Sequence, residues 1–379
     1  MSILQNVLDE ATSAQDVPFA VAMTANSAGV TFSGAAGEAR EGLKAAEDTA
    51  FRIFSMTKAI GSLAAMILID RGKLGLDTPV ADILPVWNDL RVLEGFDGDT
   101  PILRVPKTQA TLRHLATHTS GMEYEFWNPD VPKYMEMTGH PTVLSGLKTS
   151  LMYPLTTDPG TRWGYGPSID WLGQVVEAVD GRRIDAFCQD EILDPLGMKD
   201  TAFEPDALLD RLSAVSMRGE DGQFGPVDLA PPANPEFYGM GHALYSTAPD
   251  YLRILRMVLN RGKLDGTRIL SDAAFDAMIA DQMNGLTFQS MHSVAPTVSA
   301  DVEMPAGTTH SFAFVRNETD IPGMRSAGAL SWAGVCNTHY WIDPSKDLAA
   351  VIMTQSLPFL EPRFQKTYQA YEQAVYAGL

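Results

Sequence analysis

The residues of this chain that are best suited to covalent chemistry form the short motif Ser55-Met-Thr-Lys58. Residues three apart on a helix share a face, so the Ser55 hydroxyl and the Lys58 amine are expected to point into the same space. The run from Ala59 to Ile69 is almost wholly apolar, which predicts a helix buried on all sides. Burial disfavours the ammonium form of Lys58 and suits it to act as a base for a serine nucleophile. The simpler alternative, a capping serine beside a solvated lysine, fits such a helix poorly.

The residues on either side of the motif predict that Ser55 lies at the start of this helix. A short apolar run from Phe51 to Phe54 leads into Ser55, and Asp70-Arg-Gly72 marks the end of the helix. The start of a helix offers free backbone N–H groups and a partial positive charge. Both would stabilise an oxyanion that develops during acyl transfer at Ser55.

The remaining sequence predicts an α+β protein with an antiparallel sheet flanked by helices. Strand patterns are found near both ends of the chain, and helical patterns at the N-terminus, in the middle and at the C-terminus. The predicted strands are 18–24, 29–34, 309–316, 325–332, 337–343 and 348–354. The predicted helices include 2–14, a helix from Thr111, 168–179, 185–193 and 362–377. Segment 219–240 reads as a loop, and 123–160 as a long loop or lid.

This pattern predicts two domains with approximate boundaries. Residues 1–77 and 290–379, with part of 176–289, are expected to form an α/β domain. Residues of about 78–175 are expected to form a mostly helical, lid-like domain that carries Tyr165. The lid-like segment 123–160 would then set the size of the acyl group, the alcohol moiety and the stereochemical preference.

Several blocks together resemble the serine β-lactamase and penicillin-binding-protein superfamily. Within it the chain is most similar to the class C β-lactamase-like branch, and especially to the family VIII carboxylesterases. Each block is weak alone, and their order and spacing make the resemblance specific over nearly the whole chain. The blocks are Phe54–Lys58 with its apolar helix, His114–Met122, Trp163–Ser168, Pro195–Met198 and Tyr245–Tyr251. The resemblance implies a β-lactamase/transpeptidase-like fold with an inserted, mostly helical domain.

The resemblance also implies the roles of the catalytic residues. Tyr165 would act as general base or proton relay beside Ser55 and Lys58. Lys58 would supply the nearby cation that a phenol needs in order to ionise. The backbone amides of Ser55 and Val335 would form the oxyanion hole.

Two departures from the β-lactamase pattern point to uncharged ester substrates. Pro167 stands where those enzymes have an asparagine that binds the amide substituent of a lactam, and Ser168 is a candidate substitute. Trp332-Ala333-Gly334 stands in place of Lys-Thr-Gly, as in family VIII esterases, so the cation that binds a substrate carboxylate is missing. Further candidates for substrate binding are Trp332, Ala333, Gly334, Trp127, Tyr124 and His242.

Other active-site types find little support. No Gly-x-Ser-x-Gly occurs, so an α/β-hydrolase elbow is unsupported. His114 and His118 have a spacing that can hold a metal, but no third ligand is evident, so no metal or cofactor is expected. We expect His118 to be structural, His339 to be a weak candidate near the site, and Cys336 to be a small apolar residue. Cys188 and Cys336 form no disulfide framework.

The composition is that of an ordinary globular protein with a strongly acidic balance. Of 379 residues, 45% are hydrophobic, and the net charge is −19. No basic run is found, so nucleic acid is an unexpected partner. No signal peptide or membrane span is recognised, and a cytoplasmic location is expected if the chain keeps its native start. The sequence leaves the oligomeric state open.

We therefore predict a serine hydrolase that cleaves short-chain or aryl carboxylic esters through an acyl-enzyme. Three alternatives stay open. The first is an amide hydrolase on the same fold, acting as a β-lactamase, D-peptidase or short-oligomer amidase. The second is an acyltransferase, because the chemistry is identical up to deacylation. The third is a non-catalytic penicillin-binding-like module, which an intact Ser55, Lys58 and Tyr165 disfavour.

Overall fold

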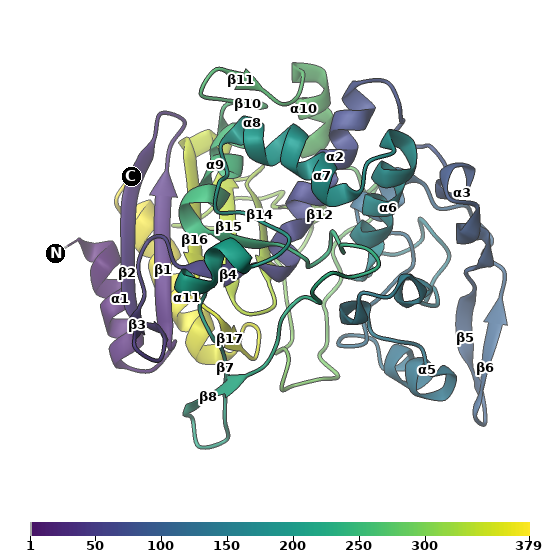
Figure 1. Cartoon of the computed structure of the whole chain (residues 1–379), viewed down its shortest axis with the longest axis horizontal. Coiled ribbons are helices and arrows are strands. Elements are labelled where there is room, and N and C mark those ends of the chain that lie inside the picture. Colours follow the sequence, from purple (N-terminus) through teal and green to yellow (C-terminus); the bar gives the residue numbers. More distant parts are fainter. Residues whose placement is uncertain (1) are drawn as a thin grey trace.

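A large antiparallel sheet forms the frame of the molecule in the computed structural model, which describes residues 2–379 (Figure 1). The sheet has eight strands in the order β12-β13-β14-β15-β16-β1-β2-β3, so strands from the two ends of the chain meet where β1 pairs with β16. Every residue of β1 is buried, as expected of a strand covered on both faces. The bounds are β1 Phe19–Ala25, β2 Val30–Arg40, β3 Leu43–Lys44, β12 Thr309–His310, β13 Val315–Arg316, β14 Leu330–Gly334, β15 Thr338–Asp343 and β16 Leu348–Met353.

Two terminal helices, α1 (Ile3–Ser13) and α11 (Pro362–Ala377), cover one face of this sheet (Figure 1). Both are amphipathic. Leu8 and Ala11 of α1 and Phe364 of α11 pack on sheet residues such as Ala22 and Trp341. The helical spacing of these apolar residues is the reason that the sequence pattern predicted both helices correctly.

The other face carries the main core. Helix α9 (Ala248–Leu259) lies against β1, β15 and β16, while α2 (Thr57–Asp70) packs on α6 (Ser168–Asp180). All residues of α2 from Thr57 to Leu68 are buried, which confirms the prediction of a central buried helix. One continuous hydrophobic cluster joins α2 to the sheet and to the middle of the chain, including Leu112. The two-domain division stays a prediction.

The remaining elements are short and lie around this frame. Hairpin β5–β6 and helices α3 and α5 lie at the end of the molecule away from α1 (Figure 1). The helices are α3 Val80–Ile83, α4 Leu112–Ala116, α5 Asp130–Thr138, α7 Ile184–Cys188, α8 Asp194–Leu196 and α10 Asp272–Ile279. The strands are β4 Ala50–Arg52, β5 Val92–Asp97, β6 Thr100–Arg104, β7 Val215–Arg218, β8 Phe224–Val227, β9 Tyr245–Thr247, β10 Lys263–Leu264, β11 Thr267–Arg268 and β17 Ser356–Leu357.

Four predicted segments differ from the structure. The presumed loop 219–240 contains β8, which pairs with β7 as a hairpin. The presumed lid 123–160 contains α5 and short 3₁₀ turns. The predicted strand 309–316 is two short strands, β12 and β13, and the predicted strand 325–332 begins five residues later, as β14 at Leu330. Turns inside these segments divide them into short elements, and their pairing with neighbouring strands, not local periodicity alone, decides their structure.

Within the described residues, no helix is long and apolar enough to cross a membrane. Cys188 and Cys336 are both free and buried.

Candidate active site

Ser55 lies in a tight turn and not in the first turn of an α-helix as the sequence predicted. Residues Phe54–Met56 form a 3₁₀ turn, and α2 begins at Thr57. Phe54 has a φ of +39°, which is strained for a bulky residue. Its ring is held in a small buried cluster with Val215, Cys336 and Leu357. The neighbouring chain segments thus fix the backbone that carries Ser55.

Lys58 lies one turn further along, with its amine fixed inside the protein. Its Nζ donates to Ser55 Oγ at 3.2 Å, to the Tyr124 hydroxyl at 3.3 Å and to the Gly241 carbonyl at 2.9 Å. The side chain is buried, as the apolar character of α2 predicted. These three contacts aim the amine at Ser55 and leave it little freedom.

Tyr165 meets Ser55 from a separate segment of the chain. Its hydroxyl donates to Ser55 Oγ at 2.7 Å, and Lys58 Nζ lies 4.8 Å from the centre of its ring. Two backbone bonds hold the segment, from Gly164 N to His118 O at 2.8 Å and from Tyr124 N to Tyr165 O at 2.9 Å. Lys58 and Tyr165, which the sequence predicted to act with Ser55 as the catalytic group, therefore both lie within hydrogen-bond distance of Ser55 Oγ.

The end of β14 lies directly against the turn that carries Ser55. A Cβ added to Gly334 would fall well inside van der Waals contact with Ile53 O and Thr338 Oγ1, so only glycine allows this approach. Among residues 2–379, the amides of Ser55 and Val335 donate no hydrogen bond outside the helix and strand ladders. Both are therefore available to a ligand, as an oxyanion hole requires.

Two cavities meet at Ser55. The first, of about 360 Å³, is lined by Trp332 and Ala333 among others, and the second, of about 350 Å³, by Tyr124 and His242 among others. Ser55, Tyr165, Trp127 and Val335 belong to the walls of both. Of the residues predicted to bind substrate, Gly334 alone does not line either cavity, because it packs beneath the site against Ile53.

Three predicted residues have additional or different contacts. Tyr124 is a hydrogen-bond partner of Lys58 as well as a cavity residue. Burial raises the pKa of Tyr124 well above 10, so it stays a neutral phenol. His242 is buried, with its Nδ1 3.6 Å from Asp170 Oδ1. Ser168 bonds to Ser120 Oγ at 2.7 Å and is fully buried, so it does not replace the missing asparagine at position 167.

The sequence analysis missed Asp170 as part of the site. This fully buried carboxylate accepts from Gly241 N at 2.9 Å, and the Gly241 carbonyl in turn accepts from Lys58. Asp170 thus holds the loop that orients the Lys58 amine. A signal was present in the sequence, because an aspartate on the apolar face of helix 168–179 must have a partner.

Two further histidines, His118 and His339, pack against aromatic side chains. His118 is buried, and its ring lies 4.9 Å from that of Tyr165. Burial, with smaller effects of His310 and Lys58, lowers the pKa of His118 well below 6.5, so it is neutral. His339 stacks on Phe364 with ring centroids 4.8 Å apart and also lines the first cavity, as its predicted place near the site requires. Within residues 2–379, no cluster of three His, Cys, Asp or Glu side chains could hold a metal.

Comparison with known proteins places this geometry in context. The profile of the Beta-lactamase family matches residues 4–375. Monacolin J acid methylbutanoyltransferase of Aspergillus terreus is 30% identical over 347 residues, covering 87% of this chain and 82% of that protein. Lovastatin esterase of Penicillium rubens is 30% identical over 327 residues, covering 82% of this chain and 80% of that protein.

Solved structures agree with the fold. A mutant of simvastatin synthase (LovD) from Aspergillus terreus has a TM-score of 0.85 and 26% identity, covering 99% of this chain and 94% of that chain. EstCE1, described as a hydrolase with promiscuous acyltransferase activity, has a TM-score of 0.79 at 23% identity, covering 99% of this chain and 97% of that chain. At that identity, EstCE1 supports the fold alone.

Proposed function

We propose that this chain, which belongs to the Beta-lactamase family, is a serine acyltransferase. It accepts an acyl group on Ser55 and passes that group to an alcohol. The donor is an ester or thioester. Water is the competing acceptor, so the same site also hydrolyses esters. This proposal keeps the acyl-enzyme predicted from the sequence and changes the preferred acceptor.

In the first step, Ser55 Oγ attacks the carbonyl carbon of the donor. The Ser55 proton moves to Lys58 in its neutral amine form or to Tyr165 in its phenolate form, since both side chains lie within hydrogen-bond distance of Oγ. The amides of Ser55 and Val335 bind the negative oxygen of the tetrahedral intermediate. Tyr165 or Lys58 then returns the proton to the leaving oxygen or sulfur, and the acyl–Ser55 ester remains.

In the second step, the acceptor alcohol attacks the acyl–Ser55 carbonyl. Its proton moves to the same Lys58–Tyr165 pair, the bond to Ser55 Oγ breaks, and Oγ recovers a proton. The products are the new ester and free Ser55. No further group is needed to balance the reaction.

The observation that carries this proposal is the meeting of two cavities at Ser55. An acyl chain in one cavity leaves the other, of about 350 Å³, free for an organic acceptor. That second wall is mostly apolar, which favours an organic alcohol over water near the acyl ester. The transferase relative from Aspergillus terreus, which spans most of this chain, adds support.

A partition assay tests the proposal. The protein is given p-nitrophenyl butyrate with increasing benzyl alcohol, and p-nitrophenol, benzyl butyrate and butyric acid are measured. We expect a saturable rise of benzyl butyrate at the expense of butyric acid. Ser55→Ala should abolish both products, whereas Ser62→Ala, a buried serine on the same helix, should keep them. Butyric acid as the sole product at every alcohol concentration would contradict transfer.

Ester hydrolysis is the second candidate, favoured by the similarity to lovastatin esterase. It predicts a product acid whose rate is independent of added alcohol. Amide hydrolysis is disfavoured by Pro167 and Trp332, because neither supplies the polar contacts that hold a lactam. Nitrocefin turnover faster than ester turnover would reverse this order. A non-catalytic module would leave Ser55 unlabelled by a fluorophosphonate probe.

A further inference from the structure

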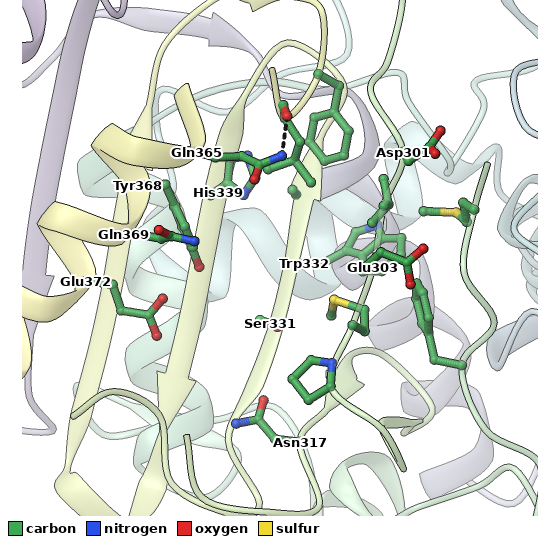
Figure 2. A pocket seen from close by; sticks show the side chains of 18 of the residues that line it. Asp301, Glu303, Asn317, Ser331, Trp332, His339, Gln365, Tyr368, Gln369 and Glu372 are labelled. Atoms are coloured by element: carbon green, nitrogen blue, oxygen red, sulfur yellow. Dashed lines mark hydrogen bonds between the residues drawn. The ribbon is translucent and has the colours of Figure 1, made fainter. Parts of the chain in front are cut away.

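The first cavity extends far beyond Ser55 along the face of the sheet that α11 covers. It follows β14 past Ala333 and Ser331, with α11 residues such as Tyr368 and Glu372 on its other side (Figure 2). Strand residues rise about 3.3 Å each, so the path from Val335 to Ser331 is about 13 Å long. A substrate arm in this cavity therefore ends far from the reacting carbonyl.

The distant end of the cavity carries polar groups that the protein leaves unused. Arg325 Nε donates to Glu372 Oε1 at 2.8 Å, and the two side chains are 14% and 2% exposed. Among residues 2–379, no partner accepts from the two terminal nitrogens of Arg325. The hydroxyls of Ser331 and Tyr368, which line the same cavity, have no hydrogen-bond partner either within that range. These free polar atoms are not among the fully buried ones, so they face the cavity and can donate to a ligand there.

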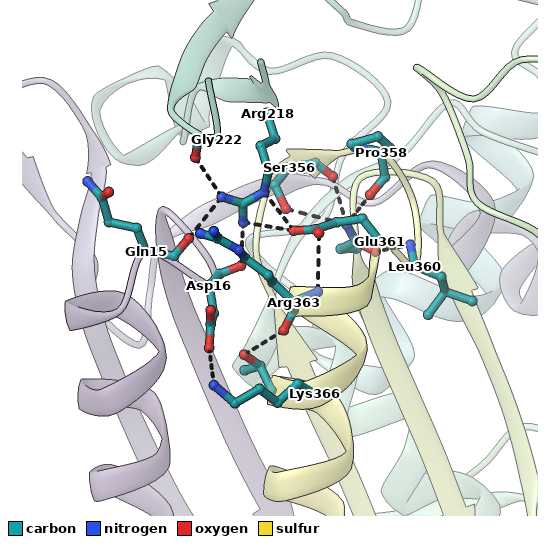
Figure 3. Close-up of polar contacts among 12 residues, drawn as sticks. Gln15, Asp16, Arg218, Gly222, Ser356, Pro358, Leu360, Glu361, Arg363 and Lys366 are labelled. Atoms are coloured by element: carbon teal, nitrogen blue, oxygen red, sulfur yellow. Dashed lines mark hydrogen bonds and ion pairs between the residues drawn. The ribbon is translucent and has the colours of Figure 1, made fainter. Parts of the chain in front are cut away.

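Arg218 shows how this chain satisfies an arginine that has a structural role. It forms a similar ion pair with Glu361 at 2.7 Å, with 10% and 12% of the side chains exposed (Figure 3). Its three nitrogens all donate, to Glu361 and to the carbonyls of Gln15, Asp16 and Gly222. Arg218 does not line either cavity. The two arginines differ in unused donors and in facing a cavity, which are the features of a binding group.

We propose that Arg325, Tyr368 and Ser331 bind an uncharged hydrogen-bond acceptor at the far end of the substrate arm that fills the first cavity. This inference rests on the proposed function of Ser55. Arginine only donates, so the bound atom is an acceptor such as a hydroxyl, ketone or amide oxygen. Glu372 balances the charge of Arg325, and Asp301 and Glu303 also line the cavity. A carboxylate would therefore meet net negative charge.

The substrate class that follows is a long, apolar ester or alcohol with a neutral polar end. Such a molecule gains hydrogen bonds to a charged donor only if its arm spans the cavity. A hydrogen bond to a charged group contributes about 1.5–3 kcal/mol, which corresponds to about tenfold or more in kcat/KM.

The test compares substrates that differ in the terminal group alone. One series is p-nitrophenyl esters of long fatty acids ending in methyl, hydroxyl or carboxylate, and the other is acetates of long alcohols with the same three ends. In the series whose long arm enters the first cavity, the hydroxyl-ended substrate should have a kcat/KM about tenfold higher than that of the methyl-ended substrate. The carboxylate-ended substrate should have the lowest kcat/KM. Lack of a hydroxyl preference in both series overturns the inference, and a carboxylate preference overturns its uncharged class.

Paired variants separate binding from folding. Arg325→Met combined with Glu372→Gln removes both charges and leaves neither one buried alone. We expect it to lose the hydroxyl preference and to keep the rate with p-nitrophenyl acetate, which does not reach Arg325. The matched control, Arg218→Met with Glu361→Gln, should lose stability and keep the preference. A preference that survives in the first double variant contradicts the proposal.

A binding measurement tests the inference even without turnover. Calorimetry with the Ser55→Ala protein compares the hydroxyl-ended and methyl-ended members of the series that shows the preference. The hydroxyl-ended ester should bind more tightly, and this difference in affinity should be lost when the Arg325/Glu372 double substitution is added. Equal affinities for the two ligands overturn the inference alone. Loss of Ser55-dependent acetate turnover in the wild type would instead overturn the proposed function.

Discussion

Gly334→Ala is the sharpest perturbation of the proposed oxyanion hole. A Cβ at this position would lie about 1 Å inside van der Waals contact with Thr338 Oγ1 and with Ile53 O, a backbone atom that accepts from Met56 N. The end of β14 must then move away from the Ser55 turn, and the Val335 amide moves with it. An oxyanion donor has to lie 2.7–3.1 Å from its acceptor, so a shift of about 1 Å removes it.

The expected cost falls mainly on kcat. Loss of one oxyanion donor lowers kcat about 100- to 1,000-fold. The overpacking itself should lower the free energy of unfolding by about 1–3 kcal/mol. KM should change little, because the ground-state carbonyl does not depend on this donor.

Steady-state kinetics with p-nitrophenyl butyrate, together with thermal unfolding, measure both effects. Gly225→Ala is the matched control, because Gly225 also lies in a strand, β8, and its added Cβ has nothing within 4 Å. The control should keep wild-type kcat. A folded Gly334→Ala protein with wild-type kcat would refute the assignment of the Val335 amide to the oxyanion hole.

Three further predictions concern the site and its supports. Tyr165→Phe removes the 2.7 Å hydrogen bond to Ser55 and should lower kcat with p-nitrophenyl butyrate about 100-fold or more, while Ser55 still reacts slowly with a fluorophosphonate. An unchanged kcat would show that Tyr165 takes no part in proton transfer. Asn337→Ala deletes the side chain that forms hydrogen bonds with Ser356 O, Pro358 O and Leu360 N, and denaturant unfolding should show that the free energy of unfolding falls by roughly 3 kcal/mol. A fall of less than about 1 kcal/mol would mean that these backbone groups find other partners. Burial lowers the pKa of His310 to about 4 and, with the charge of Arg325, lowers the pKa of His339 to about 3, so unfolding takes up protons below pH 6.5 and stability falls as the pH falls. Each histidine should lower the free energy of unfolding by about 2 kcal/mol between pH 8 and pH 5. Denaturant unfolding at the two pH values should show a smaller loss for His339→Gln, and an unchanged loss would contradict the lowered pKa of His339.

The sequence predicted best the parts whose structure is set by local pattern. Helices α1, α2, α6 and α11 follow from the spacing of apolar residues, and the beta-lactamase-like fold follows from the order of the motif blocks. The closeness of Ser55 and Lys58 follows from helix geometry alone. Tyr165 required the family resemblance, because its segment reaches Ser55 through tertiary contacts that no local pattern encodes.

The parts that the sequence did not predict depend on long-range packing. The 3₁₀ turn at Ser55 is imposed by Phe54 and its distant neighbours, such as Cys336. Asp170 acts through the backbone of Gly241, which no motif reports. The length of the first cavity, and the unused donors of Arg325 in its wall, depend on how α11 and β14 are placed on either side of that cavity. The choice between water and alcohol as acceptor is likewise a property of the cavities.

Acid quench of the reaction with p-nitrophenyl butyrate, followed by mass spectrometry of the digested protein, tests most directly whether an acyl group passes through Ser55. We expect a butyryl group on the peptide that contains Ser55, formed within the first turnover and removed faster when benzyl alcohol is added. The Ser55→Ala protein should carry no such group and should release no p-nitrophenol above background. A butyryl group on another residue, or equal turnover by Ser55→Ala, would contradict the proposed mechanism.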